Sequence, residues 1–203
     1  MNSVLMDGQA VIPSKIVCVG RNYAAHIEEL HHTLPEQPVI FVKPNSAISD
    51  QVRFQPKDVI HYEAEIVLLV RAGKFAGVGL GLDLTKRELQ TYLKQSGLPW
   101  ERAKGFDGAA VFSEFVRLDA ELSGLALELS VNGEVKQQGG YELMLFKPEM
   151  LLQEITSFMT LEDNDLLMTG TPKGVGPITP GDKLKGRVLG NGEELVMVEW
   201  VVI

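Results

Sequence analysis

The chain has 203 residues, of which 45% are hydrophobic and 23% charged, as in an ordinary globular protein. This length is enough for one hydrophobic core, so we expect a single domain over residues 1–203. The formal net charge is −8 with no local run of Lys or Arg, which argues against nucleic acid or a membrane as a partner and favours a small molecule.

A single cysteine, Cys18, lies in the apolar run at residues 16–19. It cannot form an intrachain disulfide, and its aliphatic neighbours favour a packed thiol over a nucleophile. The N-terminal residues lack the basic start and the long apolar stretch of a signal peptide. No apolar run reaches the roughly 20 residues of a membrane-spanning helix. We therefore expect a cytoplasmic protein.

Short β-branched segments separated by Gly and Pro alternate along the chain with a few stretches of helical spacing. This pattern predicts a β-rich α+β fold without repeats or linkers. In chain order, we expect a strand at residues 16–19, a helix at 24–31, strands at 39–42, 66–70 and 78–84, a helix at 86–95, a strand at 125–131, a helix at 148–158, and strands at 165–169 and 195–202.

Short motifs predict where some of these elements begin and end. Asn132 and Gly133 lie between two β-branched segments, and both suit the positive φ of a hairpin turn. Thr85 and Glu88 have the spacing of a capping box at the start of the 86–95 helix, and Gly97 is placed to end it. The sequence therefore predicts one β-hairpin and the limits of one helix from local signals alone.

The first chemical signal is a pair of glutamates at the start of the 66–70 strand. Because side chains alternate along a strand, Glu63, Glu65, Val67 and Leu69 share one face. Two buried carboxylates side by side repel each other unless a proton, a cationic side chain or a metal ion compensates them. The simpler alternative is that both lie in solvent at the rim, and the spacing alone favours it.

A third carboxylate, Asp83, closes the Gly-rich apolar segment at residues 78–84. Three carboxylates leave coordination positions for water and substrate, which suits Mg²⁺ or Mn²⁺. The lack of His and Cys clusters in the sequence disfavours zinc. Asp83 could equally interact with the dipole of the helix that follows, so the residues alone leave both interpretations open.

Seven blocks, in order along nearly the whole chain, carry a resemblance to a known family. They span residues 15–26, 41–44, 62–65, 82–87, 103–107, 131–134 and 169–176. With these blocks the chain resembles the fumarylacetoacetate hydrolase superfamily. It is most similar to the small single-domain branch that includes acylpyruvate hydrolases and oxaloacetate decarboxylases or tautomerases. The resemblance implies a mixed β-sandwich roll with short peripheral helices, a metal in a cleft and, as is common in this branch, a homodimer.

The resemblance also implies roles for single residues. Glu63, Glu65 and Asp83 would hold the Mg²⁺ or Mn²⁺ ion, in agreement with the strand periodicity. Lys104 would lie beside the metal, where a lowered pKa would suit proton exchange with an enolate.

The remaining implied residues line the substrate site. Gln90 and Thr171 would contact substrate. His26 and Glu29 are three apart in the predicted 24–31 helix, so they share a face, and the resemblance places them in a lid as a general base. Spacing alone favours an incidental pair on a solvated helix. His31 and His32 are expected to be surface residues at the helix end.

The expected function follows from the resemblance. A 2-oxo acid chelates a divalent metal, which stabilises the enolate that forms. We expect hydrolysis of acylpyruvate-type 2-oxo acids by C–C cleavage. The alternatives are decarboxylation or tautomerisation of oxaloacetate, isomerisation of 2-hydroxyhepta-2,4-diene-1,7-dioate, and a non-catalytic metal- or ligand-binding protein.

Two departures from the family pattern bear on the pocket. Arg87 is followed by Glu88 where relatives have Asp, a change that keeps the charge. The interval between Ile66 and Leu82 is short, and residues 71–77 predict a tight hairpin in place of an additional helical stretch. We expect the metal site to survive and the pocket walls or subunit interface to differ.

Overall fold

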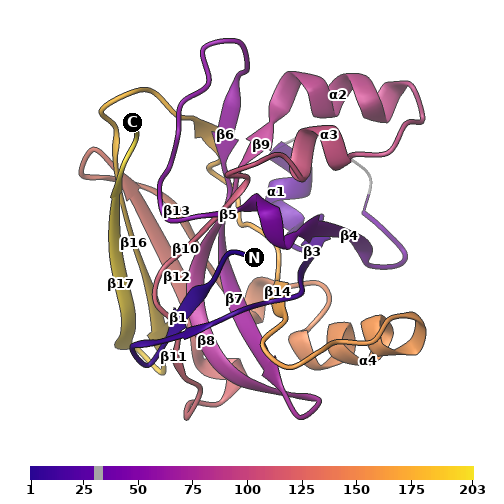
Figure 1. Ribbon diagram of the computed structural model, residues 1–203, viewed down its shortest axis with the longest axis vertical. Helices are drawn as coiled ribbons and strands as arrows, with labels where there is room; N and C mark the ends of the chain where they lie inside the picture. The colour runs from indigo at the N-terminus through magenta and orange to yellow at the C-terminus, as the bar shows by residue number, and fades with distance from the viewer. Residues whose placement is uncertain (30–33) are drawn as a thin grey trace.

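The computed structural model describes residues 1–29 and 34–203 of the chain (Figure 1). Within this part, the centre of the fold is an eight-stranded sheet with the order β4-β3-β14-β7-β8-β10-β5, and β11 pairs with β8. Its strands are β3 (Lys15–Gly20), β4 (Val39–Pro44), β5 (Ile48–Ser49), β7 (Ala64–Arg71), β8 (Lys74–Asp83), β10 (Ala110–Phe112), β11 (Val116–Arg117) and β14 (Leu166–Met168).

A second sheet packs against this one and encloses the main hydrophobic core. It has the order β13-β12-β16-β17 and is seen at the left of Figure 1. Its strands are β12 (Leu125–Val131), β13 (Glu134–Gly140), β16 (Lys183–Gly190) and β17 (Glu193–Val201). Leu80 of β8, Leu129 of β12 and Leu184 of β16 belong to one buried cluster, so the core lies between the two sheets.

Strand β7 is buried on both of its faces, which explains its apolar run at residues 66–70. Ile66 and Leu68 point into the core between the sheets, whereas Val67 and Leu69 belong to a separate cluster on the other face. The neighbouring strand β8 leaves room for the second cluster with glycine, since a Cβ at Gly81 would lie 2.7 Å from the Val67 side chain. The face that carries Glu65 is therefore packed rather than solvated.

Two small sheets and the helices complete the described part of the chain. The small sheets pair β1 (Val4–Met6) with β2 (Gln9–Val11), and β15 (Gly176–Pro177) with β6 (Ile60–Tyr62) and β9 (Thr85–Lys86). The helices are α1 (Ala24–Glu29), α2 (Arg87–Gln95), α3 (Glu101–Lys104) and α4 (Pro148–Phe158), with 3₁₀ turns η1 (Asn45–Ala47), η2 (Leu122–Gly124) and η3 (Tyr141–Leu143).

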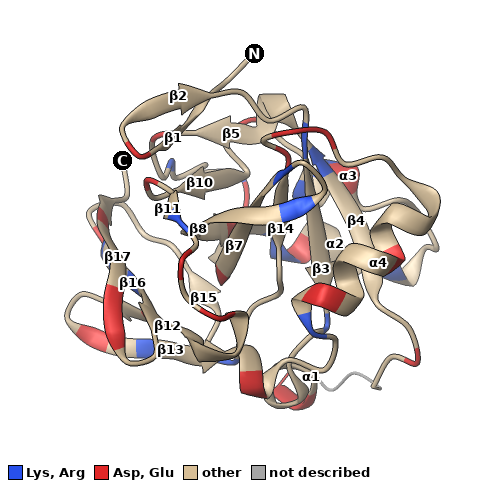
Figure 2. Cartoon of the chain, turned by 90° about the horizontal axis from the view of Figure 1, so that it is seen from below, with Lys and Arg blue, Asp and Glu red and all other residues tan. Residues whose placement is uncertain are grey.

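The helices are short and peripheral. Helices α2 and α3 lie together at one end of the molecule, near β6 and β9 (Figure 1). None of the described helices is long and apolar enough to cross a membrane. Acidic residues occur on α1, α4 and β17, on different sides of the molecule (Figure 2).

The β-rich α+β prediction is confirmed. The strand at 125–131 and the helix at 148–158 have the predicted bounds, and the other predicted elements are present with ends shifted by a few residues. The predicted 24–31 helix is confirmed as far as Glu29, and its remainder, with His31 and His32, lies outside the described residues. Asn132 and Gly133 form the β12–β13 turn with φ of 53° and 84°. The short 66–82 interval is a hairpin of β7 and β8 that turns at Ala72 and Gly73.

The predicted capping box at the start of α2 is wrong. The N-cap of α2 is Lys86, and no side chain caps the helix. Thr85 belongs to β9 instead, where its Oγ1 donates a hydrogen bond to Asp83 O (3.1 Å) and accepts one from Lys104 Nζ (2.6 Å). Tertiary contacts therefore outweigh the local capping signal. The predicted stop at Gly97 is confirmed, since Gly97 has φ of 64° directly after the helix.

Candidate metal centre and substrate cavity

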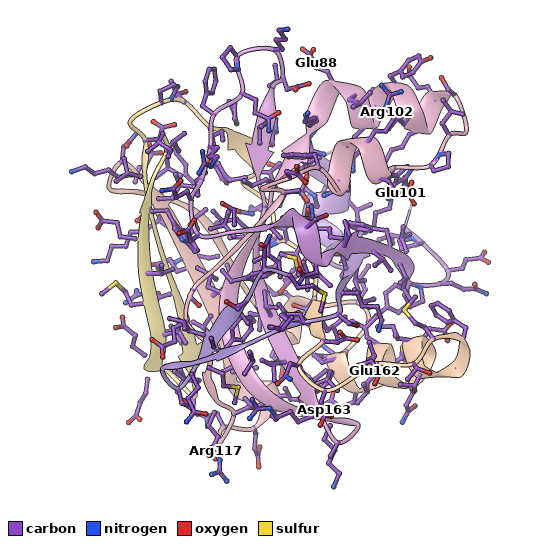
Figure 3. The ribbon with its side chains drawn as sticks, in the orientation of Figure 1. Glu88, Glu101, Arg102, Arg117, Glu162 and Asp163 are labelled. Carbon is purple, nitrogen blue, oxygen red and sulfur yellow. The ribbon has the colours of Figure 1, made fainter. Side chains whose placement is uncertain are left out.

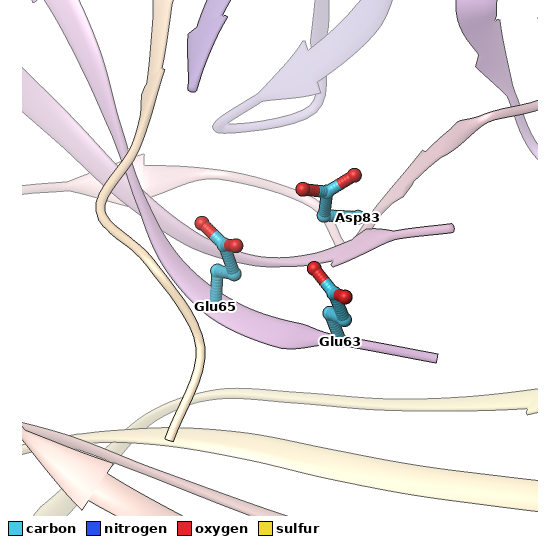
Figure 4. A group of neighbouring side chains, drawn as sticks. All are labelled: Glu63, Glu65 and Asp83. Atoms are coloured by element: carbon cyan, nitrogen blue, oxygen red, sulfur yellow. The ribbon is translucent and has the colours of Figure 1, made fainter. Parts of the chain in front are cut away.

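Three carboxylates meet where β7 begins and β8 ends. Glu63 precedes β7, Glu65 lies in β7 opposite Gly81, and Asp83 is the last residue of β8 and donates its backbone N–H to Glu63 O (2.8 Å). Each offers an oxygen within 4.8 Å of the others, and all three carboxylates project to the same side of the two strands (Figure 4). Their exposed fractions are 5%, 2% and 2%. The alternative of solvated glutamates at a rim is therefore wrong.

Cationic side chains surround these carboxylates. Lys104, at the end of α3, donates from Nζ to Glu63 Oε2 (2.8 Å) and Asp83 Oδ2 (2.7 Å). Lys43 of β4 lies 2.8 Å from Asp83 Oδ1 and also donates to the backbone carbonyl of Lys104. Arg87, the first residue of α2, forms an ion pair with Glu63. Three cations thus accompany the three buried carboxyl groups.

Glu65 is the carboxylate that these cations leave without an ion pair. Its Oε2 accepts a hydrogen bond from Gly170 N (2.7 Å), and no ion pair to it is present in the described part of the chain. Burial, with the nearby charges of Asp83 and Glu63, holds its pKa well above the usual range. Burial also tends to raise the pKa of Glu63, but Lys104 and Arg87 outweigh it and lower that pKa.

The sequence led us to expect a lowered pKa for Lys104, but the protein groups around it raise this pKa. Burial lowers the pKa of Lys104, but the charges of Asp83 and Glu63 outweigh burial and raise it above its ordinary value. The expectation assumed an adjacent metal cation, whereas two carboxylates contact the ammonium group directly. Lys104 is therefore a protonated hydrogen-bond donor in this arrangement.

The donor set fits a hard divalent cation. All its ligand atoms are carboxylate oxygens, which Mg²⁺ and Mn²⁺ favour. Asp83 Oδ1 is buried and has no aligned hydrogen-bond donor in the described residues, although Lys43 is near in distance. Glu65 also lacks a compensating cation. A metal ion bound by Glu63, Glu65 and Asp83 would supply the missing partner for both groups.

A partly open cavity lies over the carboxylates. Its walls bring together most of the residues singled out in the sequence with several that were not. The lining residues are Val19, Gly20, Arg21, His26, Phe41, Glu63, Glu65, Asp83, Arg87, Gln90, Lys94, Trp100, Lys104 and Thr171.

His26 and Glu29 form the pair that their spacing predicts. His26 Nδ1 lies 2.9 Å from Glu29 Oε2, and the Glu29 carboxylate also accepts a hydrogen bond from Gly174 N (3.0 Å). His26 lines the cavity and is buried, while Glu29 is exposed. With Nδ1 facing the carboxylate, the other ring nitrogen of His26 is left for proton transfer.

Gln90 and Thr171 also line the cavity. Gln90 Oε1 accepts a hydrogen bond from Arg87 Nη1 (2.9 Å), and Thr171 Oγ1 donates to Ala64 O (2.9 Å). Gln137 of β13, which sequence reasoning missed, is fully buried and forms hydrogen bonds with both Thr171 and Ala64. Its Nε2 donates to Thr171 Oγ1 (2.8 Å), and its Oε1 accepts from Ala64 N (2.9 Å), between the two glutamates.

Comparison with known proteins agrees with this site. The family model described as fumarylacetoacetate (FAA) hydrolase C-terminal matches residues 15–199. The oxaloacetate tautomerase YcgM of Escherichia coli K12 is 42% identical over 190 residues, which cover 84% of this chain and 86% of that protein. The oxaloacetate decarboxylase of Dictyostelium discoideum is 38% identical over 195 residues, covering 87% of this chain and 89% of that protein.

Solved structures show the same fold. A structure described as a fumarylacetoacetate isomerase/hydrolase of Oleispira antarctica superimposes with a TM-score of 0.95 at 37% identity, and each chain is covered completely. Fumarylpyruvate hydrolase of Pseudomonas aeruginosa, in complex with Mn²⁺ and pyruvate, superimposes with a TM-score of 0.89 at 27% identity, covering 100% of this chain and 95% of that one.

Proposed function

The chain belongs to the fumarylacetoacetate hydrolase family of metal-dependent enzymes, and from this membership we propose that it is a divalent-metal-dependent oxaloacetate tautomerase. The observation that carries the proposal is the buried cluster of Glu63, Glu65 and Asp83 with Lys104, in a chain 42% identical to an oxaloacetate tautomerase. This replaces acylpyruvate hydrolysis, the sequence-based expectation, as the main reading. The relatives of highest identity described above are an oxaloacetate tautomerase and a decarboxylase.

The chemistry needs a group that stabilises an enolate and groups that move two protons. Glu63, Glu65 and Asp83 would hold Mg²⁺ or Mn²⁺, and the ion would supply positive charge to the carboxylate and keto end of a 2-oxo acid. Lys104 is a protonated donor beside that position and would give a proton to the 2-oxygen.

The second proton leaves C3 of the substrate. His26 would accept it on the ring nitrogen that does not face Glu29, and Glu29 would stabilise the imidazolium that forms. The keto form thus becomes the enol, and the reverse transfers regenerate it. Gln90 and Thr171 would orient the substrate from the cavity wall.

Hydrolysis of acylpyruvates is the second candidate, because the His26–Glu29 pair is also suited to activate a water molecule. Its support among the solved structures is the fumarylpyruvate hydrolase with bound Mn²⁺ and pyruvate. Attack of that water on the distal acyl carbonyl would cleave the C–C bond and release pyruvate.

The deciding experiment measures oxaloacetate and acetylpyruvate turnover with Mg²⁺, Mn²⁺ or EDTA. Enol absorbance and pyruvate release are followed together. We expect metal-dependent enol–keto exchange of oxaloacetate that is faster than acetylpyruvate cleavage. Cleavage of acetylpyruvate as the dominant activity would favour the hydrolase. Turnover of neither substrate, with metal binding shown by calorimetry, would refute both.

The domain organisation, the oligomeric state and the compartment of the protein are also proposals. We propose one catalytic domain over residues 1–203, in a cytoplasmic protein. We also propose a homodimer, because closed twofold dimers are the commonest oligomers. Light scattering coupled to gel filtration tests the dimer, and a mass of one chain would contradict it.

A further inference from the structure

Two cations in the cavity differ from the others because no acidic group is paired with them. Lys104, Lys43 and Arg87 each contact a carboxylate of the cluster. Within residues 1–29 and 34–203, neither Arg21 nor Lys94 forms an ion pair, although both line the cavity. Arg21 Nε is also buried without a hydrogen-bond partner. Buried donors are normally satisfied, so this guanidinium has unused capacity for an anion.

The backbone holds Arg21 in an unfavourable conformation. Its φ is 57°, a left-handed value that is uncommon for a residue with a long side chain. The next residue, Asn22, is completely buried and fixed on both sides. Its Nδ2 donates to Thr169 O (2.8 Å) and Phe146 O (3.0 Å), and its Oδ1 accepts from Phe146 N (2.7 Å). These hydrogen bonds hold the chain two residues after the end of β3, next to Arg21 in the cavity wall. Backbone strain of this kind is common at ligand sites.

Lys94 comes from a different element, the last turn of α2. It lies four residues after Gln90, so both side chains face the cavity from the same side of the helix. Its Nζ lies 4.6 Å from the centre of the Trp100 ring. Burial, together with the positive charges of Arg21 and Lys104, lowers the pKa of Lys94 to about 8. This wall of the cavity therefore carries two cationic side chains that have no carboxylate partner among the described residues.

We propose that Arg21 and Lys94 bind the second carboxylate of a dicarboxylic 2-oxo acid, whose 2-oxo-carboxylate end lies at Glu63, Glu65 and Asp83. The inference rests on the proposed function and adds the residues that would recognise the second carboxylate. A planar guanidinium can bind a carboxylate through two parallel hydrogen bonds, and a nearby ammonium adds a third. The cavity would thus select dicarboxylic over monocarboxylic 2-oxo acids.

The test compares two ligands of similar size that differ in one group. Oxaloacetate carries a carboxylate where 2-oxobutyrate carries a methyl group. For Arg21→Met we expect the KM for oxaloacetate to rise at least about tenfold, while the inhibition constant of 2-oxobutyrate changes less than about twofold. For Lys94→Met we expect the same pattern with a smaller rise, because lysine offers a single point charge. Arg117→Met is the matched control, since Arg117 is exposed at the end of the molecule opposite α2 and α3 (Figure 3).

A second variant separates binding from a structural role. Arg21→Gly removes the guanidinium but adopts positive φ without strain, so we expect a melting temperature no lower than that of the wild type, together with the same loss of oxaloacetate selectivity. Equal weakening of both ligands, or no change for either, would overturn the proposal. If the wild type does not turn over oxaloacetate, the proposed function fails, and calorimetric titration of the two ligands with Mn²⁺ still decides whether Arg21 recognises the second carboxylate.

Discussion

The carboxylate cluster and the His26–Glu29 pair share one cavity but are held in place by different means. Glu63, Glu65 and Asp83 are fixed by the pairing of β7 with β8, and each is almost completely buried. The pair lies on a helix of six residues and depends on its own contact and on a hydrogen bond from Gly174. Substitutions around the cluster should therefore affect metal binding and stability, whereas substitutions in the pair should affect turnover alone.

The largest effect should come from the cluster itself. Glu65→Gln keeps the shape of the side chain and removes one anionic ligand, so we expect metal-dependent turnover to fall roughly 1,000-fold. Stabilisation by Mn²⁺ in thermal unfolding should also be lost, while the fold is kept. Glu193→Gln, at an exposed position of β17, is the control. Undiminished Mn²⁺ binding in Glu65→Gln would contradict the assignment of the cluster.

The second prediction concerns a residue that supports the cluster. Lys43 is completely buried beside Asp83, and removal of one member of a buried ion pair leaves the other charge uncompensated. We expect Lys43→Met to lower the free energy of unfolding by about 3–5 kcal/mol. Urea denaturation measures this, with the exposed Lys185→Met as the control. Wild-type stability of Lys43→Met would show that Asp83 does not need this cation.

The sequence predicted the cluster because its geometry depends on local rules. Alternation along a strand places Glu63 and Glu65 on one face, and the short hairpin turn at Ala72 and Gly73 brings the end of β8 back to them. The family resemblance added Asp83 as a ligand, and the structure confirms that the three side chains meet.

The residues that sequence reasoning missed are joined by long-range contacts. Lys43 reaches Asp83 from β4, which does not pair with β8. Gln137 reaches the backbone of Ala64, between the two glutamates, from the other sheet. No spacing within either segment signals these contacts. The positive φ of Arg21 also lies next to long-range contacts, since the Asn22 side chain forms hydrogen bonds with Phe146 and Thr169.

The third prediction tests the other side of the comparison. His26→Ala should lower oxaloacetate tautomerisation and acetylpyruvate cleavage about 100-fold, because both need proton transfer to this imidazole. Any release of pyruvate by oxaloacetate decarboxylation should fall only a few-fold, since it needs chiefly the metal and a supply of protons. Stability and Mn²⁺ binding should stay unchanged. Equal loss of all three reactions would argue that His26 holds the cavity together rather than moves protons.

The smallest effect should come from Gln137, which links the two sheets at the cluster. Leucine at this position is similar in size but satisfies neither Ala64 N nor Thr171 Oγ1, so we expect Gln137→Leu to cost about 1–3 kcal/mol of unfolding free energy. The backbone between Glu63 and Glu65 loses its fixed partner, so Mn²⁺ affinity should fall about tenfold, as for other groups that orient metal ligands. Gln138→Leu, at the exposed neighbouring position of β13, is the control. If Gln137→Leu loses stability but binds Mn²⁺ as well as the wild type, strand pairing alone fixes the cluster, and the contrast with the helix-borne pair becomes sharper.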